Sequence, residues 1–110
     1  MKLVYVTIQE QDAKPFAKTI VEKRLAACVN LVSSVQSIYA WQGQICSDAE
    51  TLMLIKTSDE RIDELRQYVN DHHPYDTPEF VVVNVQEGHS ARDYLQWVDA
   101  STRPRDSRSK

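Results

Sequence analysis

Two long segments rich in β-branched and aromatic residues flank a single Gln-Gly dipeptide, and this pattern constrains the fold more than any other. Residues 29–41 read VNLVSSVQSIYAW and residues 44–57 read QICSDAETLMLIKT. Such composition favours strands. A two-residue loop between strands needs positive φ, which Gly43 supplies without steric cost. The pattern therefore predicts one unusually long β-hairpin.

The tight turn also fixes which residues face each other across the hairpin. With a loop of Gln42 and Gly43, Trp41 lies opposite Gln44 and Tyr39 lies opposite Cys46. The alternation of side chains is interrupted around residues 33–34, which predicts a β-bulge there.

The segments outside the hairpin alternate between strand and helix patterns. We predict strands at residues 3–8 and 80–85, and helices at residues 13–25, 59–69 and 90–98. The order is β-α-β-β-α-β plus a C-terminal helix. This order predicts an α+β fold, a ferredoxin-like split βαβ sandwich with two right-handed crossovers joined by the hairpin.

Three local signals set the expected helix boundaries. Pro15 is expected in the first turn of its helix, where its missing N–H costs little. Ser58 is expected to cap the second helix, and residues 90–93 (SARD) resemble a capping box that opens the last one.

The hairpin is longer than the domain that carries it. A globular domain of 110 residues has a diameter of roughly 34 Å, whereas a thirteen-residue strand reaches roughly 44 Å. The far end carries apolar side chains, at Ile38, Tyr39, Trp41 and Ile45. Exposed apolar surface on a projecting element usually marks an interface, so we expect a homo-oligomer. The alternative is a hairpin that folds back over its own sheet at the bulge.

Length and charge limit the domain organisation and the partners. A chain of 110 residues allows one domain, placed at residues 1–100, followed by a basic and disordered tail at residues 101–110. The tail carries net charge +3, so with −3 overall the first hundred residues carry −6.

An acidic body disfavours nucleic acid, and no apolar run is long enough for a membrane span. Without a secretory leader pattern, a cytoplasmic location is expected.

Few residues carry recognisable chemistry, and each also has a structural interpretation. His72 and His73 are imidazole donors for copper, zinc, nickel or iron, but histidines in a last helical turn also stabilise the C-terminal dipole, and the residues alone favour this structural role. The two cysteines, Cys28 and Cys46, lie near opposite ends of the hairpin, which argues against an intrachain disulfide. Lys56 ends an apolar run and either binds a ligand or reaches water. The sequence contains none of the common catalytic or nucleotide-binding motifs.

Five blocks of the sequence stand out together: LAACVN (25–30), SIYAWQGQI (37–45), LMLIKT (52–57), HHPYDTPE (72–79) and YLQWV (94–98). In order and spacing they resemble the CutA family of divalent-cation tolerance proteins. The resemblance implies a non-enzymatic homotrimer, built through long strands that extend sheets between subunits, with a role in tolerance of and response to divalent metal ions. No organic cofactor is implied.

The resemblance also assigns residues to two kinds of site. His72 and His73 match the histidines proposed as copper ligands in that family. Some members have a cysteine near the end of the first strand, where this sequence has Val6 and Thr7. A cleft between subunits is implied as well, lined by Cys28, Trp41, Lys56, Tyr75 and Glu79.

Two other functions share the expected fold. The first is a signalling module similar to the trimeric PII proteins, which bind small anionic effectors in clefts between subunits; Lys56 fits such a cleft. The absence of a glycine-rich phosphate loop and the acidic body argue against it. The second is an acylphosphatase-like hydrolase, for which no anion-binding Arg and Gly loop is present.

Overall fold

The computed structural model describes residues 1–104 and shows a mixed α+β fold with one antiparallel four-stranded sheet in the order β2-β3-β1-β4. The elements are β1 (Lys2–Ile8), α1 (Glu10–Glu22), β2 (Cys28–Trp41), β3 (Gln44–Thr57), η1 (Asp59–Arg61), α2 (Ile62–His72), β4 (Val81–Asn84), η2 (Glu87–His89) and α3 (Arg92–Ser101). The predicted α+β class is confirmed, and this strand order fits the ferredoxin-like arrangement.

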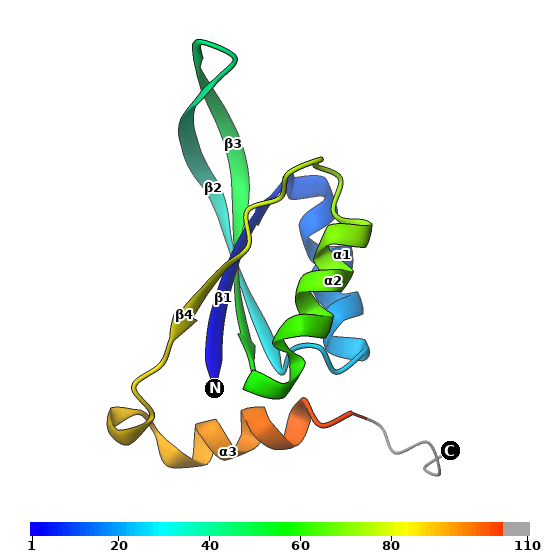
Figure 1. Cartoon of the computed structure of the whole chain (residues 1–110), viewed down its shortest axis with the longest axis vertical. Helices are drawn as coiled ribbons and strands as arrows, with labels where there is room; N and C mark the ends of the chain where they lie inside the picture. The colour runs from blue at the N-terminus through cyan, green and yellow to red at the C-terminus, as the bar shows by residue number, and fades with distance from the viewer. Residues whose placement is uncertain (105–110) are drawn as a thin grey trace.

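The hairpin of β2 and β3 projects beyond the rest of the molecule (Figure 1). The chain measures 50 × 35 × 21 Å along its principal axes. The alternative of a hairpin folded back on its sheet is therefore wrong for this chain. The predicted partners Tyr39–Cys46 and Trp41–Gln44 are confirmed, and the register shifts between Val32 and Val35, as expected for a bulge.

Positive φ angles mark the two irregular points of the hairpin. Both turn residues adopt them, Gln42 at 51° and Gly43 at 77°. The sequence pattern indicated this only for Gly43, but a type I′ turn requires it at both positions. Inside the bulge, Ser34 has a φ of 62°, which accounts for the break in alternation.

One face of the sheet carries the hydrophobic core. Helices α1 and α2 lie on that face (Figure 1). Strands β1 and β3 contribute fully buried side chains to it, at Val4, Val6, Ile8, Met53 and Ile55. The helices contribute buried residues at helical spacing, at Ala13, Phe16, Ala17, Ile20, Leu65 and Val69.

The opposite face of the sheet is only partly covered. Successive side chains of a strand point to opposite faces, so the residues between the buried ones form this second face. Leu3, Tyr5, Leu52 and Leu54 lie there half-buried. The edge strand β4 adds Val81 and Val83, which pair with Tyr5 and Leu3 and are about 40% exposed. A single chain thus leaves an apolar sheet face open.

Helix α1 begins earlier than its apolar pattern indicates. It starts at Glu10 and ends at Glu22, so Pro15 lies inside the helix rather than in its first turn. Leu25, expected in the helix, follows it as a buried residue after Arg24, whose φ of 61° ends the helix.

Ser58 occupies the N-cap position of η1, which leads into α2, but neither expected serine makes a side-chain capping bond. Ser58 makes no capping bond to the helix that follows, and its hydroxyl instead accepts a hydrogen bond from Thr102 at 2.9 Å. Ala91 precedes α3 in the capping position, while Ser90 donates to the Gln86 carbonyl at 2.7 Å. At Ser58 a distant residue competes for the hydroxyl, and at Ser90 the carbonyl of the preceding turn does.

The last strand and the C-terminal boundary also differ from the sequence pattern. Strand β4 is limited to Val81–Asn84, because its ladder with β1 spans only Lys2 to Tyr5. Thr102 is fully buried, so the folded body extends past residue 100. Residues 105–110 of the expected tail lie outside the described residues. Within residues 1–104, no helix is long and apolar enough to cross a membrane.

Candidate functional site

The residues expected to line a cleft lie at separate places along the hairpin and its flanks. Lys56 and Cys28 pair across its base, whereas Trp41 pairs with Gln44 at its tip. Eleven residues of β3 lie between Gln44 and Lys56, a path of roughly 40 Å. One chain therefore cannot bring Trp41 and Lys56 into one pocket.

A group of polar side chains surrounds Lys56 on the open sheet face, and we term it the base cluster: Cys28, Asn30, Lys56 and Tyr94. The Lys56 ammonium donates to Asn30 Oδ1 and lies 3.8 Å from Cys28 Sγ. Tyr94 reaches the cluster from α3, where burial and then the neighbouring Cys28 raise the pKa of its phenol. Within residues 1–104, Lys56 forms no ion pair with a carboxylate.

Two tyrosine–carboxylate pairs form a second group, the mid-hairpin cluster: Tyr39, Asp48, Glu50 and Tyr75. Tyr75 Oη donates to Glu50 Oε2 at 2.7 Å, and Tyr39 Oη donates to Asp48 Oδ2. Glu50 is 8% exposed although it carries a carboxylate. Burial and then the bond to Glu50 raise the pKa of Tyr75 above its ordinary range, and the bond to Asp48 raises that of Tyr39 to about 12.

The two remaining cleft candidates make few contacts. Trp41 is 58% exposed and lies among other exposed apolar residues of the hairpin tip. Glu79 is exposed in the segment before β4. The side chains of both are thus available to groups outside this chain.

Both ring nitrogens of His73 are bound to the backbone. Its Nε2 lies 2.9 Å from the Thr7 carbonyl oxygen, and its Nδ1 lies 3.0 Å from the Tyr75 backbone nitrogen. A carbonyl only accepts and an N–H only donates, so Nε2 carries the proton and Nδ1 accepts. The ring is 8% exposed. In this arrangement His73 ties the segment after α2 to the end of β1 and has no lone pair for a metal.

His72 is bound differently and keeps a donor atom. Its Nδ1 donates to the Tyr68 carbonyl at 3.1 Å, and its ring stacks on that of Tyr68 with centroids 4.1 Å apart. This tautomer places the lone pair on Nε2. The side chain is exposed. His72 can therefore contribute one imidazole ligand, although no group of three metal-binding side chains occurs within residues 1–104.

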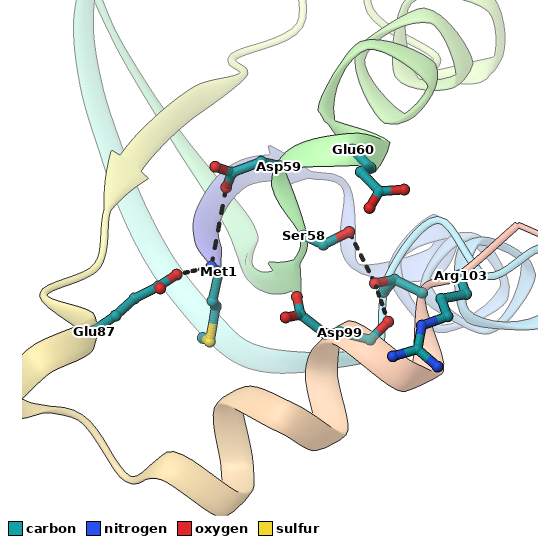
Figure 2. Close-up of a pocket in the computed structure, with 8 residues that line it drawn as sticks. Met1, Ser58, Asp59, Glu60, Glu87, Asp99 and Arg103 are labelled. Carbon is teal, nitrogen blue, oxygen red and sulfur yellow. Dashed lines mark hydrogen bonds and ion pairs between the residues drawn. The ribbon is translucent and has the colours of Figure 1, made fainter.

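Acidic side chains gather around a pocket of about 320 Å³ at the base of the molecule (Figure 2). The carboxylates of Asp59, Glu60, Glu87 and Asp99 line it together with Arg103. The Met1 ammonium pairs with Glu87 and lies 3.9 Å from Asp59. None of the residues predicted from the sequence lies here, and the ammonium already balances part of the negative charge.

The sequence did not identify Asn30 as a partner of Lys56 or Glu50 as a partner of Tyr75. Asn30 pairs with Leu54, one step along the same face from Lys56, so the hairpin register could have identified it once the one-residue shift at the bulge is counted. The burial of Glu50 had no such signal, because Tyr75 reaches it from a loop with no regular spacing.

The chain is similar to known proteins over almost all of its described length. Residues 2–101 match the model of the family described as CutA1 divalent ion tolerance protein. The divalent-cation tolerance protein CutA of Thermus thermophilus is 42% identical over 102 residues, which cover 92% of this chain and 97% of that protein. The chloroplastic protein CutA of Arabidopsis thaliana is 41% identical over 92% of this chain, but the match spans only 55% of that longer protein.

A solved structure shows the same fold. The PII-like protein CutA from Nostoc sp. PCC 7120, solved in apo form, superposes with a TM-score of 0.91 at 37% identity. That match covers 96% of this chain and 100% of the Nostoc chain.

Proposed function

The chain belongs to the CutA1 family of divalent ion tolerance proteins, and on that premise we propose that it acts as a non-enzymatic homotrimer in tolerance of divalent metal ions. The proposal includes a cytoplasmic location. It includes no organic cofactor, nucleic acid or membrane as a partner.

The observation that carries the homotrimer is apolar surface that one chain leaves open. Ile38 and Ile45 at the hairpin tip are 71% and 76% exposed, and Trp41 beside them is 58% exposed. The second face of the sheet adds half-buried leucines and the exposed valines of β4. A soluble monomer rarely keeps such a projecting apolar element in water, whereas further copies would cover it.

Sedimentation equilibrium tests this assembly directly. We expect a mass of three chains at micromolar concentration and no dissociation on dilution to the nanomolar range. A mass of one chain in dilute buffer would remove the homotrimer and every cleft between subunits.

The metal bound by the protein is proposed to be copper or another divalent cation, with the His72–His73 pair as the predicted site. His72 fits this role, because its Nε2 lone pair is exposed and its other nitrogen is held by a carbonyl. His73 would have to release both backbone partners first. Since one chain offers one ready donor, further ligands would come from solvent or from other copies.

Calorimetric titration with copper tests the site. We expect the His72→Ala variant to lose the tightest binding, and a His89→Ala variant, which removes an exposed histidine from η2, to keep it. Binding should weaken as the pH falls through the imidazole range, because protons compete for the same nitrogen. Equal copper affinity in the parent, His72→Ala and the His72→Ala, His73→Ala double variant would rule out this site.

A second function is favoured by Lys56. Its ammonium, half-buried on the open sheet face, interacts with neutral groups and with no carboxylate in the part of the chain that the structure describes. Such a charge suits a small anionic effector in a cleft between subunits, as expected for a PII-like module.

A thermal-shift screen of nucleotides against divalent metals separates the two functions. A ligand that binds only the folded protein raises the melting midpoint. A rise with nucleotides that is lost in Lys56→Ala supports the effector function, while a rise with metals alone supports the metal function.

A further inference from the structure

The base cluster places a thiol and an amine together across two strands. Cys28 and Lys56 are direct cross-strand partners, with Sγ and Nζ 3.8 Å apart. Asn30 Oδ1 accepts a hydrogen bond from the same Nζ and so holds the lysine head beside the sulfur. Both side chains are half-buried in one chain, and the cleft between subunits that the resemblance implies at these residues would keep them within reach of small solutes.

This pairing is chemically distinctive because an oxidised sulfur and an amine can form a bond. A thiol oxidised to sulfenic acid has an electrophilic sulfur, which condenses with a nearby nitrogen to a sulfenamide. The flexible lysine side chain can cover the remaining distance without moving the backbone. Cys46 provides the contrast, since its cross-strand partner is Tyr39 and, within residues 1–104, no amine forms a hydrogen bond with it.

We propose that Cys28 and Lys56 form a reversible cross-link when the protein meets a hydroperoxide. The Cys28 thiol gives two electrons to the peroxide O–O bond, which yields a sulfenic acid and one molecule of water or alcohol. Lys56, after its ammonium loses a proton to solvent, attacks the sulfur. The S–O bond breaks, the oxygen leaves as water, and an S–N bond joins the two residues. An external thiol reverses the link by attacking the sulfur and releasing the amine.

The cross-link would change charge while leaving the fold in place. It joins two residues that already face each other in the sheet, so little strain is expected. It removes the ammonium of Lys56 from the base cluster. The cross-link itself does not depend on the proposed function, whereas its effect on an anionic effector rests on the second candidate above.

The Cys46→Ser variant provides a suitable test, because it excludes disulfides with the other cysteine. The folded variant is treated with hydrogen peroxide, blocked with a thiol-alkylating reagent and digested with trypsin. Residues 25–56 hold no other Lys or Arg before Lys56, so the unmodified protein yields the peptide 25–56. We expect the oxidised protein to yield instead a peptide spanning 25–61, lighter by two hydrogens than the same peptide with an intact thiol and amine.

Two controls make the result specific. Adding Lys56→Arg keeps a positive charge and a trypsin site but replaces the primary amine, so the light peptide should disappear while the circular dichroism melt stays cooperative. Treatment with dithiothreitol should restore the peptide 25–56. Sulfenic or sulfinic acid on Cys28 with normal cleavage after Lys56 would overturn the proposal, and so would a light species that persists in the Lys56→Arg variant.

Discussion

Tyr75 Oη lies 2.7 Å from Oε2 of Glu50, and this hydrogen bond joins the segment after α2 to the middle of the long hairpin. Glu50 is buried, and within residues 1–104 it forms no ion pair. The Tyr75 phenol thus donates a hydrogen bond to a Glu50 carboxylate that burial has largely removed from solvent. The same segment begins at His73, which is itself bound to the end of β1.

Replacing Tyr75 by Phe should therefore destabilise the protein. The change leaves the Glu50 carboxylate buried without its donor, which costs about 1–3 kcal/mol. Urea unfolding followed by circular dichroism measures the loss. Tyr39→Phe is the matched control, because it removes the other phenol–carboxylate bond at a residue that is 43% exposed. Equal losses in the two variants would contradict the importance of burial at Glu50.

The raised pKa of Tyr75 predicts how stability changes in alkali. Above a pH of about 10 an unfolded tyrosine loses its proton, while the folded protein still holds the proton of Tyr75. The folded state then binds more protons, so the free energy of unfolding falls as the pH rises. This contribution is fully present below the unfolded pKa.

Urea midpoints measured from pH 9 to 11, taken as a range about the tyrosine pKa, should show a shallower decline in Tyr75→Phe than in the parent. Tyr39 and Tyr94 also have raised pKa values, so part of the decline remains in both proteins. Parallel curves would mean that Tyr75 does not titrate differently on folding.

Replacing His73 should lower the free energy of unfolding much more than replacing the adjacent His72. His73→Ala removes the hydrogen-bond partner of the buried Thr7 carbonyl and that of the half-buried Tyr75 N–H, and the loss at the carbonyl alone should cost about 1–3 kcal/mol. His72→Ala removes an exposed ring on the last turn of α2 and should change the free energy of unfolding by less than about 0.5 kcal/mol. Chemical denaturation of both variants without metal checks this contrast, which reversed values would refute.

Much of the hairpin and sheet could be predicted, because the alternation of side chains along a strand and the backbone angles of a tight turn depend on neighbouring residues. The Gln42-Gly43 turn set the register near the tip, the bulge shifts it by one residue so that Cys28 lies opposite Lys56, and strand length alone indicated that the hairpin projects. The helix starts were less predictable, because Ser58 bonds to Thr102, which becomes its neighbour only after folding, and Ser90 bonds back to the preceding turn at Gln86 instead of capping α3.

The candidate site could be predicted only in part, since long-range contacts decide what each residue does. Adjacent histidines are alike in the sequence, yet His73 is buried against Thr7, far away along the chain, while His72 stays exposed. Similarly, nothing near Glu50 in the sequence indicates that a tyrosine from another segment will cover it.

Assembly through the hairpin tip should be sensitive to a charge placed among its apolar residues. Ile45 is 76% exposed in one chain, so Ile45→Lys should leave the fold of that chain intact while opposing its burial against another copy, since a buried unpaired ammonium is costly. Gln42→Lys places the same charge in the adjacent turn and serves as the control. Sedimentation equilibrium should show dissociation to smaller species for Ile45→Lys and an unchanged mass for Gln42→Lys, with similar far-ultraviolet circular dichroism for both. An unchanged mass for Ile45→Lys would place the subunit interface away from the tip.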